Sequence, residues 1–257
     1  FVGALVAGVV CLIVFLDARK KGRLAPAGFS TVTRWDGDRF AARFAAYLII
    51  YVLVSTIVEF QVPKDAPAMW VGAATLVTVL ALSLLFLKVP IQRRADSFRS
   101  VLGRIKPLGR NIGLAVFAYL SIVPILLVAV VLAQAFTQFF PQPTHPIVDE
   151  IRSATSTDWL ALFLTAAVLA PVLEELTFRG MLLPALASRT SRPLWAMLAC
   201  GFLFACIHPQ GPLIWPALMS VGVAAAYLRY YTGSVVPSIV LHMIHNGLLL
   251  SVSYFLI

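Results

Sequence analysis

Apolar residues fall in long runs that short polar segments separate along the whole chain. Each run is close to the roughly 20 residues that a helix needs to cross about 30 Å of hydrocarbon. The pattern therefore predicts an all-α fold, a polytopic transmembrane helix bundle of about eight helices. The expected spans are residues 1–16, 41–62, 66–87, 111–139, 158–186, 193–208, 213–228 and 234–257. Because the first run begins at once at Phe1, we expect it to be the remainder of a longer span and not a signal peptide.

Composition points the same way. Hydrophobic residues make up 60% of the chain and charged residues 12%, and the mean hydropathy is +0.92. A soluble domain of this length does not need that much apolar surface. A net charge of +9 would suggest nucleic acid as the partner of a soluble protein. Here the basic residues cluster beside apolar runs, as in membrane proteins, so we expect a lipid bilayer as partner and no nucleic acid.

The basic residues also predict how the chain is threaded. They concentrate in the loops after the first and third spans, residues 17–40 and 88–110, which should be cytoplasmic, whereas the connections between them are poor in Lys and Arg. Both termini should then lie outside, in a multi-pass protein of the plasma (inner) membrane of a bacterium. A proline-containing segment, 141–157, separates an N-terminal membrane region (1–157) of four spans from a four-helix membrane domain (158–257). Thr157 or Asp158 is expected to cap the fifth span.

Charged and imidazole side chains inside the spans are the candidates for chemistry, because each costs a few kcal/mol or more in hydrocarbon. The candidates lie in the fifth, sixth and eighth spans, whereas Glu59, near the outer end of the second span, is expected to reach the interface. These candidates are Glu174, Glu175, Arg179, His208, His242, His245 and Asn246.

Helical spacing assigns different parts to these residues. Glu175 and Arg179 are four apart and share a face, so they can form an ion pair in a dry site. Glu174 lies about 100° round the helix and is the carboxylate left free for acid–base chemistry. His242 and Asn246 also share a face, whereas His245 points more to one side.

Depth in the membrane brings three spans together. Counted from an inner turn near residue 191, Glu174 and His208 are both roughly 25 Å up antiparallel helices. Counted from a turn near residue 232, His242 and Asn246 are roughly 15 and 21 Å up the last helix. One polar chamber within the membrane can therefore collect all four side chains.

The motifs Glu174-Glu175-x-x-x-Arg179, Phe204-x-x-x-His208 and His242-x-x-x-Asn246 resemble those of the CPBP family, the CAAX-protease and bacteriocin-processing membrane proteases. The resemblance covers roughly residues 158–257, which it marks as a CPBP-like catalytic domain. It implies an endopeptidase that hydrolyses a peptide bond of a membrane-associated peptide or protein, such as a CAAX-type substrate. Glu174 with His208 would activate the water, and His242 and Asn246 would bind the oxyanion. Glu175 and Arg179 would hold the helix that bears the base.

Members of this family have also been described as metalloproteases. One glutamate with two histidines is an adequate zinc set, so Glu174, His208 and His242 are the ligands if Zn²⁺ is bound. No H-E-x-x-H helix is present, and Asn246 is a better oxyanion donor than zinc ligand. We favour a glutamate mechanism that requires no cofactor.

Other interpretations stay open. The Glu175–Arg179 pair can simply glue helices together, His208 can be an interfacial histidine, and His242 with Asn246 can form interhelical hydrogen bonds. Buried carboxylates and histidines also occur in ion-coupled transporters. A non-catalytic immunity or scaffold protein that retains the family's fold is a further alternative.

Overall fold

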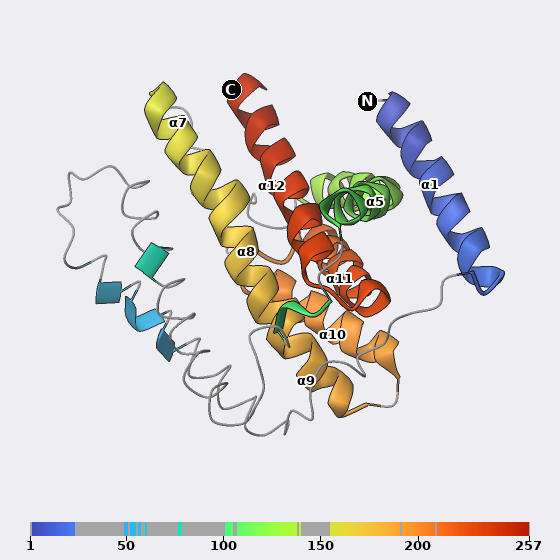
Figure 1. Ribbon diagram of the computed structural model, residues 1–257. Coiled ribbons are helices and arrows are strands. Elements are labelled where there is room, and N and C mark those ends of the chain that lie inside the picture. The colour runs from blue at the N-terminus through green and yellow to red at the C-terminus, as the bar shows by residue number, and fades with distance from the viewer. Residues whose placement is uncertain are drawn as a thin grey trace, which may run out of the picture.

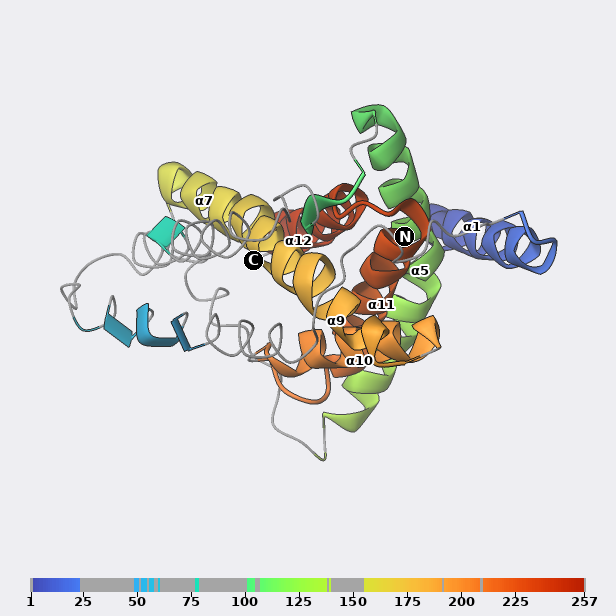
Figure 2. The same cartoon turned by 60° about the horizontal axis from the view of Figure 1, so that its bottom comes forward.

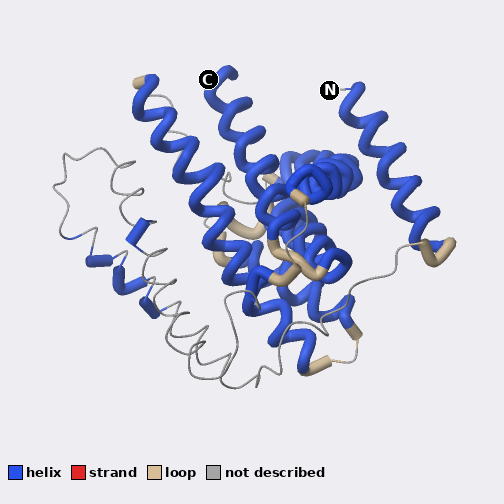
Figure 3. The backbone as a smooth tube through the Cα atoms, viewed as in Figure 1, coloured by secondary structure: helices blue, strands red, loops and turns tan. Residues whose placement is uncertain are grey.

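The computed structural model describes residues 2–23, 101–104, 107–137, 139, 155–190, 192–208 and 210–256, with scattered positions between residues 49 and 78. In these parts the chain forms helices joined by turns, with one isolated bridge between Gly103 and Ser234. The all-α prediction is therefore confirmed (Figure 3). The expected spans 41–62 and 66–87 lie largely outside the described residues, and each of the other six coincides with a helix or a run of helices.

Helical elements follow one another closely in the C-terminal part of the chain. They are α1 (Val2–Lys20), α5 (Leu108–Phe136), α7 (Ser156–Phe163), η1 (Leu164–Leu169), α8 (Ala170–Glu175), η2 (Leu176–Leu182), α9 (Leu183–Ser188), α10 (Pro193–Cys206), α11 (Trp215–Thr232) and α12 (Val236–Leu256). By length and composition, three described runs can cross a membrane: Leu108–Phe136, Asp158–Ser188 and Val236–Phe255. Pro193–Cys206 is a shorter apolar helix.

Elements α7 to α9 form one continuous helical rod, called here the long rod, which packs against α12 (Figure 1). Helix α5 crosses the bundle and contacts α1, α11 and α12; Figure 2 shows it along its length. The start of α1 and the end of α12 lie at the same end of the bundle (Figure 1), as the predicted threading requires. The expected N-terminal region therefore packs directly on the C-terminal helices through α5.

Two π-helical segments, η1 and η2, interrupt the long rod. The N–H of Ala170 bonds to Thr165 O, and the N–H of Leu183 bonds to Phe178 O, five residues back in each case. Such π segments are rare and are frequent at functional sites. The short helix α8 between them carries Glu174 and Glu175. The depth argument from the sequence assumed unbroken α-helices, and the rod departs from that assumption on both sides of the two glutamates.

The long rod begins with a capping box. Thr155 Oγ1 accepts from the backbone N–H of Asp158 at 3.3 Å, and Asp158 Oδ2 accepts from the backbone N–H of Thr155 at 3.1 Å. The expectation that Thr157 or Asp158 is the cap was wrong. Asp158 is the third residue of the helix and completes the reciprocal pair, because the helix starts at Ser156.

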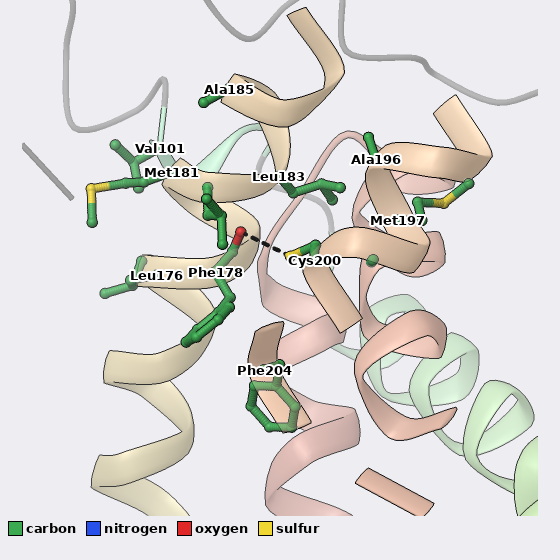
Figure 4. Packing of buried hydrophobic residues seen from close by; sticks show 12 residues of the cluster. Val101, Leu176, Phe178, Met181, Leu183, Ala185, Ala196, Met197, Cys200 and Phe204 are labelled. Carbon is green, nitrogen blue, oxygen red and sulfur yellow. Dashed lines mark hydrogen bonds between the residues drawn. The ribbon is translucent and has the colours of Figure 1, made fainter. Parts of the chain in front are cut away.

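The largest apolar core lies between the lower half of the long rod and α10 (Figure 4). In it the Phe178 and Phe204 rings meet edge to face at 5.4 Å, and Cys200 Sγ lies 3.5 Å from Phe178 O. The outer faces are apolar too: on α5, Val128 and Val131 are 59% and 62% exposed. Contiguous apolar surface of this kind is unfavourable in water and suits contact with lipid.

A short segment, 101–104, docks on the turn between α11 and α12. Arg104 N–H donates to Gly233 O and Val235 N–H donates to Leu102 O, both at 2.9 Å. Gly103 has a φ of +76° and lies so close to Gly233 that a Cβ there would overlap the Gly233 carbonyl. The end of the second basic loop and the α11–α12 turn therefore lie on the same side of the bundle, where both are predicted to be cytoplasmic.

Candidate active site

Glu175 is fully buried and ties three parts of the fold together. Its Oε1 atom accepts from Arg179 Nη1 at 2.8 Å and lies 3.0 Å from His242 Nδ1. Arg179 donates from Nη2 to Gly222 O at 2.9 Å, and its guanidinium carbon lies 4.6 Å from the centre of the Phe204 ring. The predicted ion pair is therefore present, and it joins α8 and η2 to α10, α11 and α12.

Glu174 is the free carboxylate, as its position on the helix predicted. Its side chain is 27% exposed, against 1% for Glu175. Its Oε2 atom lies 3.9 Å from His208 Nε2 and 3.9 Å from His242 Nε2, and it makes no hydrogen bond to the described residues. The depth argument thus placed the three side chains correctly: they come from α8, the end of α10 and α12 and converge on one oxygen atom.

The hydrogen bonds of the two imidazoles indicate their tautomers. His208 Nδ1 lies 2.7 Å from Phe204 O, and His242 Nδ1 faces the Glu175 carboxylate. A carbonyl and a carboxylate only accept, so both Nδ1 atoms carry the proton. In the neutral rings both Nε2 atoms then present lone pairs toward Glu174. Separations of 3.9 Å are too long for direct hydrogen bonds, but one water molecule donating its two hydrogens can bridge such acceptors.

Asn246 lies one turn beyond His242 on α12 and is engaged elsewhere. Its Nδ2 atom donates to Ala166 O of η1 at 2.8 Å. Two N–H groups stand on that nitrogen, so the second remains for another acceptor. The Nδ1 atom of His245, which was expected to point more to one side, lies 3.4 Å from the hydroxyl of Tyr119 on α5.

Comparison with known families matches this region of the chain. The family model described as type II CAAX prenyl endopeptidase Rce1-like matches residues 156–248, which include all seven named residues of the three motifs. Residues 156–248, which match this family model, are called here the Rce1-like domain. The family resemblance predicted from the motifs is therefore confirmed.

One curated relative of the chain is the uncharacterized protein YyaK of Bacillus subtilis (strain 168). It is 30% identical over 112 residues, which are 40% of this chain and 38% of that protein. The chain thus spans well under half the length of the relative that it matches. No solved structure matches the chain.

Three side chains of the Rce1-like domain carry atoms of the kind that bind zinc, but these atoms lie too far apart to share one zinc ion. Glu174, His208 and His242 are ordinary zinc ligands in kind, and both imidazoles have their Nδ1 atoms held by acceptors, as metal-bound histidines do. Ligands at about 2.0–2.2 Å in tetrahedral geometry lie roughly 3.3–3.5 Å apart, whereas both nitrogens are 3.9 Å from the Glu174 oxygen. In the described parts of the chain, no group of three such residues is placed to hold a metal ion. These separations do not match tetrahedral coordination of zinc by the three residues.

The sequence analysis missed three neighbours of the site, two of them within the Rce1-like domain and one outside it. Arg229, which follows the seventh expected span, is only 1% exposed, and its Nε atom donates to Arg179 O at 3.3 Å. The Tyr119 hydroxyl is supplied by α5, outside the matched region. Gly222 supplies a carbonyl to Arg179. Only Arg229 carried a signal in the sequence, since it is charged and follows an apolar run directly.

Proposed function

We propose that this protein is an intramembrane endopeptidase that hydrolyses a peptide bond of a membrane-associated substrate. One observation carries the proposal: Oε2 of Glu174, a buried oxygen without a hydrogen-bond partner among the described residues, lies 3.9 Å from two imidazole nitrogens, on a side chain that is 27% exposed. Glu175, its neighbour, is held by Arg179 and His242 and is not free to react. The Rce1-like match supports the same reaction class.

Water activation follows from the acceptor atoms that meet at Glu174. A water molecule among them donates one hydrogen to Glu174 Oε2 and the other to His208 Nε2, which leaves its lone pair directed at the substrate carbonyl carbon. As the O–C bond forms, Glu174 takes the proton. Glu174 then returns that proton to the leaving nitrogen as the C–N bond breaks, so the carboxylate is regenerated.

The oxyanion formed in the first step needs hydrogen-bond donors. Asn246 keeps one N–H after its bond to Ala166 O. His242 can donate from Nε2 when it is an imidazolium, and the Glu175 carboxylate beside its Nδ1 is the matching counter-charge. Each donor of this kind contributes roughly 3 kcal/mol to stabilising the intermediate. Arg179 keeps Glu175 in place for this purpose.

The substrate follows from where the site lies. Its residues come from helices whose outer faces are apolar, so the cleaved bond must belong to a peptide that reaches membrane depth. The matched family is described by its action on CAAX prenyl proteins. Lipidated peptides with a CAAX-type C-terminus are therefore the first substrates to test, beside unmodified membrane peptides.

The test compares cleavage by the purified, detergent-solubilised full chain with that of Glu174→Gln and His208→Ala. We expect kcat to fall by about 100- to 10,000-fold in Glu174→Gln, the usual contribution of a general base. The control is Asp17→Asn, the same change of carboxylate to amide at an exposed position on α1, which should cleave like the wild type. Undiminished cleavage by a folded Glu174→Gln protein would contradict the assignment of the base.

A metal chelator separates the two chemical versions of the proposal. Activity that survives chelation supports the glutamate mechanism. Activity that is lost and then restored by Zn²⁺ identifies Glu174, His208 and His242 as metal ligands instead. A protein that cleaves no membrane peptide, and whose Glu174→Gln variant alters ion flux in proteoliposomes, would be a carrier and not a protease.

A further inference from the structure

The two π segments of the long rod end in the same way. Each is followed, two residues later, by a proline: Pro171 after η1 and Pro184 after η2. The N–H of the residue before each proline is already bonded five residues back, to Thr165 O and Phe178 O. The same arrangement of π turn and proline therefore occurs on both sides of Glu174 and Glu175.

At the end of each π segment, this arrangement leaves one backbone carbonyl without either of its possible helical donors, the N–H groups four and five residues later. In an α-helix, Ala166 O would accept from Ala170 and Arg179 O would accept from Leu183, but those N–H groups point elsewhere. In a π-helix the donors would be residues 171 and 184, which are prolines and have no N–H.

Side chains from other helices supply the missing donors. Asn246 Nδ2 on α12 donates to Ala166 O at 2.8 Å, and Arg229 Nε on α11 donates to Arg179 O at 3.3 Å. A buried carbonyl without a donor is unfavourable, so each of these bonds holds its helix to the rod at a fixed point.

Arg229 forms no ion pair with the described residues and is placed to donate a hydrogen bond to Arg179 O. It is 1% exposed, its Nη1 and Nη2 atoms have no hydrogen-bond partner among the described residues, and Gly103 covers it so closely that a Cβ there would overlap Nη1. The carbonyl that it holds belongs to Arg179, whose side chain in turn holds Glu175.

We propose that Arg229 is a positioning residue of the hydrolytic site: its Nε–H replaces the backbone donor that Pro184 lacks and thereby fixes Arg179, Glu175 and His242. Asn246 does the same at η1. This inference rests on the proposed function, but its structural part can be measured without a substrate.

Two substitutions of matched length test the role of the Nε–H. In Arg229→Gln an amide nitrogen takes the place of Nε, so the donor is kept and the charge is lost. In Arg229→Met both are lost. We expect Arg229→Met to lower kcat by about 10- to 100-fold with little change in KM, as for the loss of one hydrogen bond from a charged donor. Arg229→Gln should recover most of that loss, and Arg19→Met, at an exposed arginine on α1, should have no effect.

Pro184→Ala provides the second test, because it restores an N–H five residues after Arg179. In that background Arg229→Met should cost much less, both in kcat and in the midpoint of thermal unfolding. Equal activities of the Gln and Met variants, or fully additive effects of Pro184→Ala and Arg229→Met on the unfolding midpoint, would overturn the inference. If the wild type cleaves no peptide, the proposed function fails, and the unfolding midpoints still decide the role of Arg229.

Discussion

Glu175→Gln and Asp17→Asn change two ion pairs of nearly equal geometry in very different surroundings. Both acids pair with a base four residues later, at 2.8 Å for Glu175 with Arg179 and 2.7 Å for Asp17 with Lys21. The side chains of the first pair are at most 1% exposed, and those of the second are 47% and 52% exposed. The two ion pairs therefore have the same sequence spacing and nearly the same N···O distance, and they differ in the burial of their side chains.

The magnitude follows from what remains after the substitution. Removing one partner of a buried ion pair costs about 3–5 kcal/mol, because the other charge stays buried without compensation. The glutamine keeps one acceptor for the two donors on Oε1, so we expect the lower end, about 3 kcal/mol. At roughly 2–4 °C per kcal/mol for a chain of this size, the unfolding midpoint should fall by about 6–12 °C. An exposed pair is worth about 0–1 kcal/mol, so Asp17→Asn should change the midpoint by no more than about 4 °C.

The assay is thermal unfolding of both purified variants in the same detergent, followed by loss of helical circular dichroism. A double variant, Glu175→Gln with Arg179→Met, should be more stable than the sum of the two single effects, since the uncompensated charge is gone. If Glu175→Gln and Asp17→Asn shift the midpoint equally, the reasoning from burial is refuted.

Two further predictions concern the neighbours of the glutamates. Gly222→Ala should lower stability by about 1–3 kcal/mol and reduce cleavage as well, because its Cβ would lie 2.9 Å from Gly201 Cα and 3.2 Å from Arg179 Nη2. The control is Gly113→Ala, since Gly113 has open space around it. Equal stability of the two variants would contradict the packing argument. Asn246→Ala should lower both kcat and stability. If the second N–H of Asn246 binds the oxyanion, adding Pro171→Ala should restore stability but not kcat. Recovery of kcat as well would mean that Asn246 acts only through its bond to Ala166 O.

Several parts of the site could be predicted from the sequence because they depend on local geometry or on counting. The Glu175–Arg179 pair follows from a spacing of four along one helical run, and it forms although Arg179 lies in the π segment η2. The meeting of Glu174 with His208 follows from equal depth on antiparallel spans, because a helix rises by a constant amount per residue, and the same counting placed His242 near that level.

Other parts were beyond such reasoning. The π segments change the rise and the rotation per residue on both sides of the two glutamates. Their position depends on how prolines, bulky side chains and neighbouring helices compete, not on residue spacing alone. For the same reason the partners of Asn246 and Arg229 could not be predicted: both bind carbonyls that are free only because the helix is irregular there. The start of the long rod at Ser156 was missed because Thr155, Thr157 and Asp158 are all acceptable caps.

The sequence by itself determined that this protein is a membrane helix bundle, which residues are the candidates for its chemistry and which family its C-terminal region resembles. Composition, periodicity and motif spacing are local properties that survive any arrangement of the helices. Only the tertiary structure decided that Glu175 is shared by Arg179 and His242 and that Glu174 faces two imidazole nitrogens. It also decided that Arg229 donates a hydrogen bond to Arg179 O of the long rod. These contacts join residues from separate helices over a few ångströms, and such distances are set by packing.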